Sequence, residues 1–185
     1  IMSGAYEHNW KKHPVLQDAF ATHQNQLPLY NLRLSNLSAA VIRPQLPHLQ
    51  DRVRSGLRNH DYVADKLNES PFIVVPPALK GEARAPDSIQ FNLVDLNDEQ
   101  VRAFVKQAAL GGVTVQVFGL SDDNARAFWN WQFIRDLPDV PQTRAMLMRA
   151  CDVRLPVRLD VAQLDAVVYV LLNAVTAVTQ PIAAE

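Results

Sequence analysis

Apolar residues recur at helical spacing over residues 35–68 and predict one long helix. Ser35 stands before this pattern and can cap the first turn by accepting a backbone N–H. Pro44 and Pro47 fall inside it, and we expect them to kink the helix, because proline lacks a backbone donor. Gly56 costs about 1 kcal/mol relative to alanine in a helix, so packing must fix that stretch. The apolar positions are Leu37, Val41, Leu49, Val53, Leu57, Ala64 and Leu67.

Shorter segments carry the pattern of strands. Residues 72–75 form an apolar run that ends at two prolines, which indicates a brief edge strand. Residues 89–93 and 113–117 alternate apolar and polar side chains, which is typical of half-buried strands. A further extended piece is predicted over residues 153–157, broken by Pro156.

Three helices are predicted after the first. Residues 97–110 begin with a capping-box pair, Asn97 and Gln100, and end at two glycines that suit a left-handed C-cap. A short helix is predicted over residues 143–151. The last helix begins with a second capping pair, Asp160 and Gln163. Its apolar stretch, residues 164–178, is shorter than a membrane span and contains polar residues, so we expect a buried helix and no membrane partner.

These elements predict an α/β (α+β) fold in which a small sheet is covered on one face by helices. The result is a small two-layer domain preceded by a long kinked helix. Such a helix is expected to pack partly on another domain or on a second subunit.

Composition narrows the class of protein. The chain has 185 residues, 48% of them hydrophobic, and a formal charge of −1. The near-zero charge argues against a general nucleic-acid binder, and the hydrophobic content excludes a disordered chain. Cys151 is the single cysteine, so no internal disulfide can form, and no signal-peptide pattern is present. The expected compartment is the cytoplasm.

The sequence contains no strong motif for a catalytic site that this chain could form alone. The sequence has no Gly-x-Ser-x-Gly elbow, and Gly111 and Gly112 end a helix where a phosphate loop would start one. His8 and His13 are five residues apart, a spacing that suits neither a helix nor a strand as a metal site. We predict no metal site and no catalytic residue in this chain.

A stretch near the N-terminus carries a family resemblance. Residues 30–40 read YNLRLSNLSAA and are followed by Pro44, Gln45, Leu46 and Leu49. This stretch resembles the N-x-R-x-S-x-L-x-A-A … Q-L-x-x-L segment of the DegT/StrS-type aminotransferases. These are pyridoxal-phosphate (PLP) enzymes of fold type I that often act on nucleotide-linked keto-sugars. Residues 1–7, 88–93, 112–118 and 151–156 also resemble family segments, in the family's order.

The resemblance implies that this chain is the C-terminal half of such an enzyme. In the family, a large domain carries the Schiff-base lysine, the acidic partner of the pyridine nitrogen and the aromatic residue that stacks on the ring. None of these aligns here, because every lysine of the chain follows the place of the family's lysine. The resemblance therefore predicts PLP in the intact enzyme and none bound to this chain alone. The lysines are Lys11, Lys12, Lys66, Lys80 and Lys106.

The resemblance also implies three parts. Residues 1–34 would be an N-terminal arm from a truncated large domain, residues 35–70 a long connecting helix, and residues 71–185 the small C-terminal α/β domain, the C-terminal domain of a fold type I PLP transferase.

Two residues are predicted to bind the cofactor. By resemblance, Asn31 reaches the PLP phosphate of the neighbouring subunit in a homodimer, and its amide is a suitable donor. The alternative is an ordinary turn asparagine before a helix. Arg33 can pair with a phosphate or a substrate carboxylate through its planar fork. The alternative for Arg33 is an ion pair at the helix start.

Three residues are predicted to bind substrate. Arg154 can hold a substrate anion, or it can be a strand-end arginine paired with Asp152 or another acid. Trp131 flanks a loop where substrates often contact this family, and Tyr6 can line the entrance. For both aromatic residues, packing in a core is the alternative.

Two hypotheses for function follow. In the first, the chain is the C-terminal domain of an aminotransferase that aminates a keto-sugar with glutamate as donor, and it is inactive alone. In the second, it is a non-catalytic binding or regulatory module derived from the same fold. A weaker third alternative is an unrelated two-layer domain that matches the motif by coincidence.

Overall fold

The chain divides into two compact units. The computed structural model describes Val15, Asp18 and residues 34–84, 86–120, 126–130 and 136–180. The units are Ile1–Leu49 and Gln50–Glu185. The three-part division at residues 34 and 70 stays a prediction.

The first unit contains a short helix whose start follows the predicted cap. Ser35 Oγ accepts the backbone N–H of Ser38 at 3.0 Å, at the start of α3 (Asn36–Ile42). A 3₁₀ segment, η2 (Arg43–His48), follows and contains both prolines. The prolines therefore interrupt the predicted helix, because neither can donate to the α-helical ladder. Helix α4 (Leu49–Leu67) then begins.

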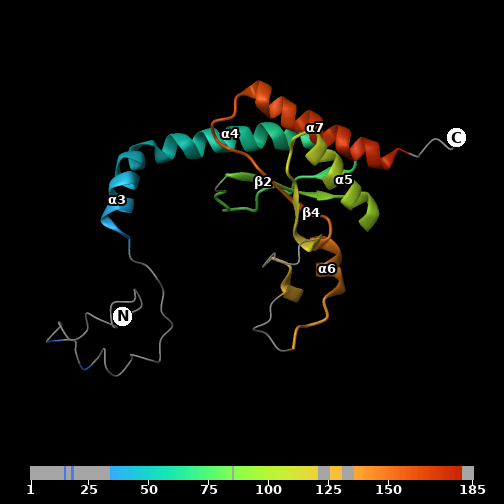
Figure 1. Cartoon of the computed structure of the whole chain (residues 1–185), viewed down its shortest axis with the longest axis horizontal. Helices are drawn as coiled ribbons and strands as arrows, with labels where there is room; N and C mark the ends of the chain where they lie inside the picture. Colours follow the sequence, from blue (N-terminus) through green and yellow to red (C-terminus); the bar gives the residue numbers. More distant parts are fainter. Residues whose placement is uncertain are drawn as a thin grey trace. The chain divides into compact units, whose positions relative to one another are not determined.

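The second unit is built on a four-stranded sheet (Figure 1). Its strands are β1 (Ile73–Val74), β2 (Ser88–Leu93), β3 (Gln116–Val117) and β4 (Ala150–Arg154). Their order is β1-β2-β4-β3, and every neighbouring pair is antiparallel. The predicted edge position of β1 is confirmed.

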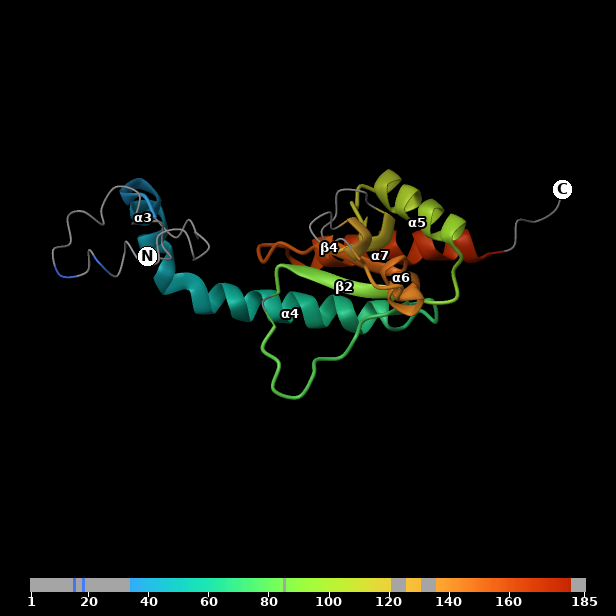
Figure 2. The ribbon, with the colours of Figure 1, turned by 90° about the horizontal axis from the view of Figure 1, so that it is seen from below.

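Helices cover one face of this sheet. The buried side chains of α4, α5 (Asp98–Leu110) and α7 (Val161–Thr179) share one core with the apolar side chains of the strands. Figure 2 shows α5 beside α7, above the connection between β1 and β2. The predicted two-layer fold is confirmed. The strand residues in this core are Ile73, Ile89, Phe91, Leu93, Val117, Cys151 and Val153.

Both predicted capping boxes are present. In each, the side chain of the N-cap residue accepts the backbone N–H of the third helical residue, a glutamine. The side-chain oxygen of that glutamine accepts the backbone N–H of the N-cap residue in return. Helix α5 ends at Gly111, and Gly112 follows at φ 87°, a left-handed conformation that glycine adopts without strain.

Helix α7 lies along α4 as well as α5. Tyr62 Oη of α4 donates to Asp165 Oδ1 of α7 at 2.7 Å, and Lys66 Nζ lies 3.6 Å from the same oxygen. The hydrogen bond to Asp165 raises the pKa of Tyr62. α7 is long and apolar enough to cross a membrane by length and composition, but its Leu164, Leu171 and neighbouring apolar residues pack in the core.

Three predicted elements were wrong in their bounds. The strand predicted over residues 113–117 pairs only at Gln116–Val117. The helix predicted over residues 143–151 is α6 (Pro141–Leu147), and Cys151 belongs to β4. The extended piece predicted over residues 153–157 therefore begins earlier, at Ala150. Cys151 pairs with both Phe91 and Val117, so contacts distant in sequence decided its conformation.

Close packing against α4 explains why glycine stands at position 56. A Cβ at this position would lie 2.6 Å from the carbonyl oxygen of Pro86 and 3.1 Å from Val157 Cγ1. The helix therefore passes directly against the backbone of residue 86, and only glycine permits this approach. The expectation that packing fixes this stretch is confirmed.

Candidate functional site

The second face of the sheet is polar. In the register, Gln90 and Gln116 both lie opposite Asp152, so these three side chains form one row across β2, β4 and β3. Ser88 lies opposite Arg154 in the next row on the same face. Polar side chains thus replace the apolar ones that fill the helix-covered face.

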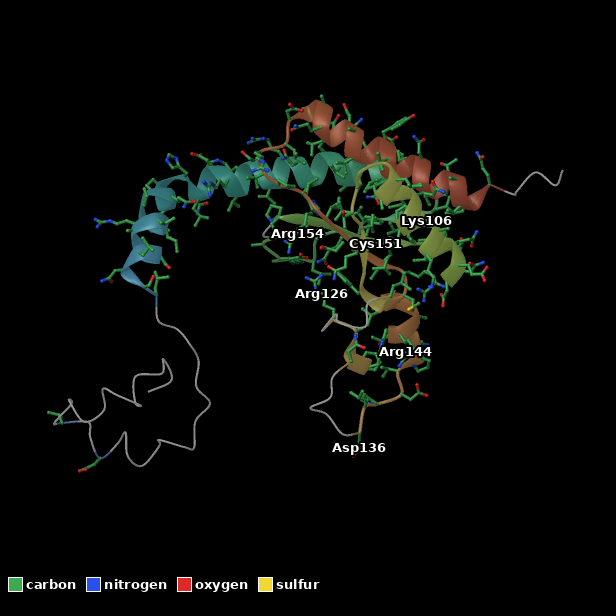
Figure 3. All side chains as sticks on the ribbon, viewed as in Figure 1. Lys106, Arg126, Asp136, Arg144, Cys151 and Arg154 are labelled. Atoms are coloured by element: carbon green, nitrogen blue, oxygen red, sulfur yellow. The ribbon has the colours of Figure 1, made fainter. Side chains whose placement is uncertain are left out.

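A pocket of about 690 Å³ lies between this polar face and the connection that follows β1. This volume is within the range of small-molecule sites. Figure 3 shows Arg154 on β4 and Arg126 beyond β3, with Lys106 apart from them on α5. The charged or titratable residues that line the pocket are His60, Glu82, Arg84, Asp87, Arg126, Asp152 and Arg154.

Arg154 is paired at the rim of the pocket. Its Nη1 lies 2.5 Å from Asp87 Oδ2, and both side chains are about three-quarters exposed (73% and 74%). The acid that pairs with Arg154 is therefore Asp87. Solvent screens such an exposed pair, so it holds the guanidinium loosely and leaves it accessible to an anion. The predicted substrate-binding role of Arg154 stays a prediction.

A second network holds the connecting loop. Arg84 donates to the Pro76 carbonyl at 2.7 Å, to His60 Nε2 at 3.3 Å and to Glu82 Oε1 at 3.2 Å. Because a guanidinium can only donate, His60 Nε2 accepts, and its Nδ1 carries the proton toward Asp61 at 3.3 Å. This network ties the loop to α4.

Glu82 completes that network. Its Oε2 accepts the Leu79 N–H at 2.7 Å. This hydrogen bond, with the nearby positive charge of Arg84, holds the pKa of Glu82 below its ordinary value. Glu82 is therefore a carboxylate at neutral pH and closes the turn of the loop.

Asp152 is the unusual residue of the site. Its side chain is 7% exposed, and Oδ1 has no hydrogen-bond partner among the described residues. A buried carboxylate oxygen without a donor is energetically costly. Asp152 also lines a smaller cavity of about 260 Å³ on the Gln116 side.

Cys151, its neighbour in sequence, points to the opposite face and is fully buried. Burial raises the pKa of its thiol far above the ordinary value. The protonated thiol behaves as a small apolar side chain, as the sequence indicates, and is not a nucleophile.

Four of the five predicted site residues lie outside the described residues. They are Tyr6, Asn31, Arg33 and Trp131, and their roles stay predictions. The structure adds Asp152, Gln90 and His60 to Arg154, a group that sequence reasoning missed. The alternation of Ser88, Gln90 and Asn92 with apolar residues was the available signal, because it marks a strand with one polar face.

The described residues do not by themselves fit PLP. Lys66 contacts Asp165 on the helical side, Lys80 is in the exposed loop, and Lys106 is on the outer side of α5. None of these three lysines lines either of the two pockets that border the polar face. None of them is therefore placed to form a Schiff base there. The described residues also contain no cluster of three His, Cys, Asp or Glu side chains that could hold a metal.

Comparison with protein families gives one match over most of the chain. The model of the DegT/DnrJ/EryC1/StrS aminotransferase family matches residues 8–172. A search of curated proteins finds no significant match.

Solved structures share the fold. 3-Amino-5-hydroxybenzoic acid synthase superposes with a TM-score of 0.61 at 17% identity, over 82% of this chain and 41% of that one. The sugar aminotransferase CalS13 from Micromonospora echinospora gives 0.60 at 14% identity, over 78% and 37%. The PLP form of Spr1654 from Streptococcus pneumoniae gives 0.64 at 15% identity, over 91% and 46%. The chain thus spans less than half the length of these relatives.

Proposed function

Because this chain belongs to the DegT/DnrJ/EryC1/StrS aminotransferase family, we propose that it forms the C-terminal part of a PLP-dependent aminotransferase. The proposed reaction transfers an amino group from glutamate to a keto-sugar. The family match over residues 8–172 carries this proposal. The sugar aminotransferase among the structural relatives supports the substrate class. The cytoplasm is the proposed compartment.

In this proposal, the residues that break and form bonds belong to a large domain that would precede this chain. PLP, when bound, supplies an electron sink, and a lysine of that domain would move the protons. Residues 1–34 would be an arm of that domain, residues 35–70 a connecting helix and residues 71–185 the small domain.

The roles proposed for individual residues concern binding. Asn31 would donate its amide N–H to the PLP phosphate of the neighbouring subunit in a homodimer, and Arg33 would add a charged donor. Arg154, Trp131 and Tyr6 would contact the substrate. Exposed apolar residues on α3 and η2 support a partner surface, because Leu37 and Leu46 are 77% and 58% exposed.

The first experiment tests whether the 185-residue chain is inactive alone. We expect the chain mixed with PLP to show no new imine band at roughly 400–430 nm and no label after borohydride reduction, because the described lysines lack a suitable pocket. Mass spectrometry of the reduced protein identifies any lysine that carries the adduct. A borohydride-stable adduct on a single lysine would contradict the proposal.

The second experiment compares this chain with the product of the complete reading frame. We expect that product, loaded with PLP, to form 2-oxoglutarate from glutamate when a nucleotide-linked keto-sugar is added, and the 185-residue chain to form none. If the complete product binds no PLP, the alternative of a non-catalytic binding module replaces the proposed function.

A further inference from the structure

We propose that His60 and Arg84 form a pH-sensitive latch, which holds the loop of residues 76–84 on α4 and releases it when His60 is protonated. The latch is a single hydrogen bond, in which Arg84 Nη1 donates to His60 Nε2 at 3.3 Å. The His60 side chain is 8% exposed, so its ring is fixed in place on α4. The latch concerns this loop alone and does not depend on the proposed aminotransferase function.

Little apolar packing holds the loop of residues 76–84. Every residue from 76 to 83 is exposed, and Arg84 is half-buried. Among the described residues, the hydrogen bond from Arg84 to His60 is the one that joins this loop to α4. A segment with few buried contacts depends on such bonds for its position. Loss of this bond should therefore free the loop, while its ends stay fixed at Val75, bonded to Asn68, and at the buried Pro86.

The loop is held together from within by other hydrogen bonds. Arg84 Nη2 donates to the Pro76 carbonyl at 2.7 Å, and Arg84 Nε donates to Glu82 Oε1 at 3.2 Å. Glu82 Oε2 accepts the Leu79 N–H at 2.7 Å. None of these bonds includes His60. The loop can therefore leave α4 as one unit without breaking them.

Protonation of His60 removes the acceptor of the latch. A neutral imidazole has one acceptor nitrogen, which is Nε2 here, whereas an imidazolium ion carries an N–H on both nitrogens. An imidazolium at position 60 would turn an N–H towards the guanidinium of Arg84, and two cations would face each other 3.3 Å apart. Because neither group can accept, the contact cannot persist. Histidine takes up its proton between about pH 8 and about pH 5.

The other charges around His60 do not replace this acceptor. Asp61 lies 3.3 Å from Nδ1, which carries a proton in both forms of the ring, and its side chain is 73% exposed to solvent. Asp61 can favour the imidazolium, but it restores no acceptor at Nε2. Glu82 lies on the loop side, with both oxygens bonded within the loop. The other charged groups that line the cavities beside His60 make no hydrogen bond to it among the described residues, and they are Asp65, Asp87, Arg126, Asp152 and Arg154.

Release of the loop would change access to two cavities. One, of about 690 Å³, lies between the loop and the polar face of the sheet, and the other, of about 810 Å³, lies between the loop and α4. His60, Pro76 and Arg84 line both cavities, so the latch belongs to the wall that they share. Figure 2 shows the loop as the long connection between β1 and β2. The latch would thus let pH regulate access to the polar face.

NMR of the 185-residue chain between about pH 8 and about pH 5 tests the latch. At the higher pH, we expect the His60 ring to carry its proton on Nδ1, as read from the ¹⁵N shifts of its two nitrogens. As the pH falls, the ring should titrate, and the ¹⁵N order parameters of residues 78–83 should fall by at least about 0.2 with the same midpoint. A ring that titrates while the loop keeps its order would overturn the proposal. So would a ring that does not titrate, or a proton on Nε2 at the higher pH.

A matched pair of substitutions locates the effect. His60→Gln keeps a side-chain acceptor for Arg84 but cannot be protonated in this range, and we expect its loop to stay ordered at every pH. His48→Gln changes an exposed histidine of η2 that lines neither cavity, and it should keep the transition. Release in His60→Gln at the same pH as in the wild type would contradict the latch, as would loss of the transition in His48→Gln. If His60→Gln does not fold, the wild-type titration still decides.

The transition can be separated from the titration of Glu82. The hydrogen bond from the Leu79 N–H holds the pKa of Glu82 below its ordinary value of 4.5. Glu82 therefore keeps its charge over the whole range in which His60 is expected to titrate. A loop that is released only below pH 4.5 would assign the effect to Glu82 and overturn the proposal.

Discussion

The two faces of the sheet have opposite chemistry although the same strands build both. On one face, Phe91 and Val153 are almost fully buried against helices. On the other, Gln90 and Arg154 border a pocket with ion pairs at its rim. Strands place successive side chains on opposite faces, so one segment can stabilise the fold and present a binding surface at once. We therefore expect substitutions on the helix-covered face to change stability, and those on the polar face to change it little.

The largest expected effect is on the helix-covered face. Phe104 of α5 meets Phe91 of β2 edge-to-face, with ring centroids 6.3 Å apart. Phe104→Ala should lower the free energy of unfolding by about 3–5 kcal/mol, because it leaves a cavity in the core. Urea denaturation measures the change, with Arg102→Ala on the exposed side of the same helix as control. A loss below about 1 kcal/mol would show that α5 and the sheet do not share a core.

A smaller loss is expected where α4 meets the backbone that leads into β2. Gly56→Ala improves helix propensity by about 1 kcal/mol, but its Cβ would fall 2.6 Å from the Pro86 oxygen. We expect a net loss of about 1–3 kcal/mol in urea denaturation. Asp65→Ala, on the exposed side of α4, controls for propensity. A stabilised Gly56→Ala protein would mean that this close approach is absent in solution.

We expect loss of the Arg154–Asp87 ion pair on the polar face to change the stability of the fold little. Arg154→Ala should change the free energy of unfolding by less than about 1 kcal/mol, because the Arg154–Asp87 pair is exposed and screened. A double-mutant cycle with Asp87→Ala isolates the coupling between the two side chains. A coupling above about 2 kcal/mol would place this pair among the structural interactions and weaken the contrast between the faces.

The smallest expected effect is a local response to pH in the loop over the pocket. The pKa of Glu82 is lowered from its ordinary value of 4.5, so its carboxylate stabilises the folded loop above that pH. The stabilisation should be lost as the pH falls through the lowered pKa. The NMR shift of the Leu79 amide proton should follow this titration, with a midpoint below 4.5. Glu82→Gln should remove the titration, and a midpoint above 4.5 in the wild type would contradict the assignment.

Local signals predicted the three capped helix starts well and the strand bounds poorly. The side chains of Ser35, Asn97 and Asp160 bond to backbone groups within three residues, so short-range sequence contains the whole interaction. Cys151 looked like the end of a helix, but its strand conformation depends on Phe91 and Val117, which lie far away in sequence. Pairing over such separations leaves little trace in a local pattern.

The candidate site was predictable only in part. Arg154 was identified from the sequence, but its partner is Asp87 rather than Asp152. The sequence named Asp152 only as an alternative partner of Arg154, because burial of Asp152 Oδ1 without a donor is a property of the surrounding elements.

The amino-acid sequence by itself determined the helix caps, the interruption at the prolines, the two-layer class and the family, because these depend on residue types at short, fixed spacings. Only the tertiary structure decided the strand order, the need for glycine at position 56 and the pocket around Asp152. Each of these depends on residues brought together from distant segments, and the free energy of such contacts is set by packing and by loss of water.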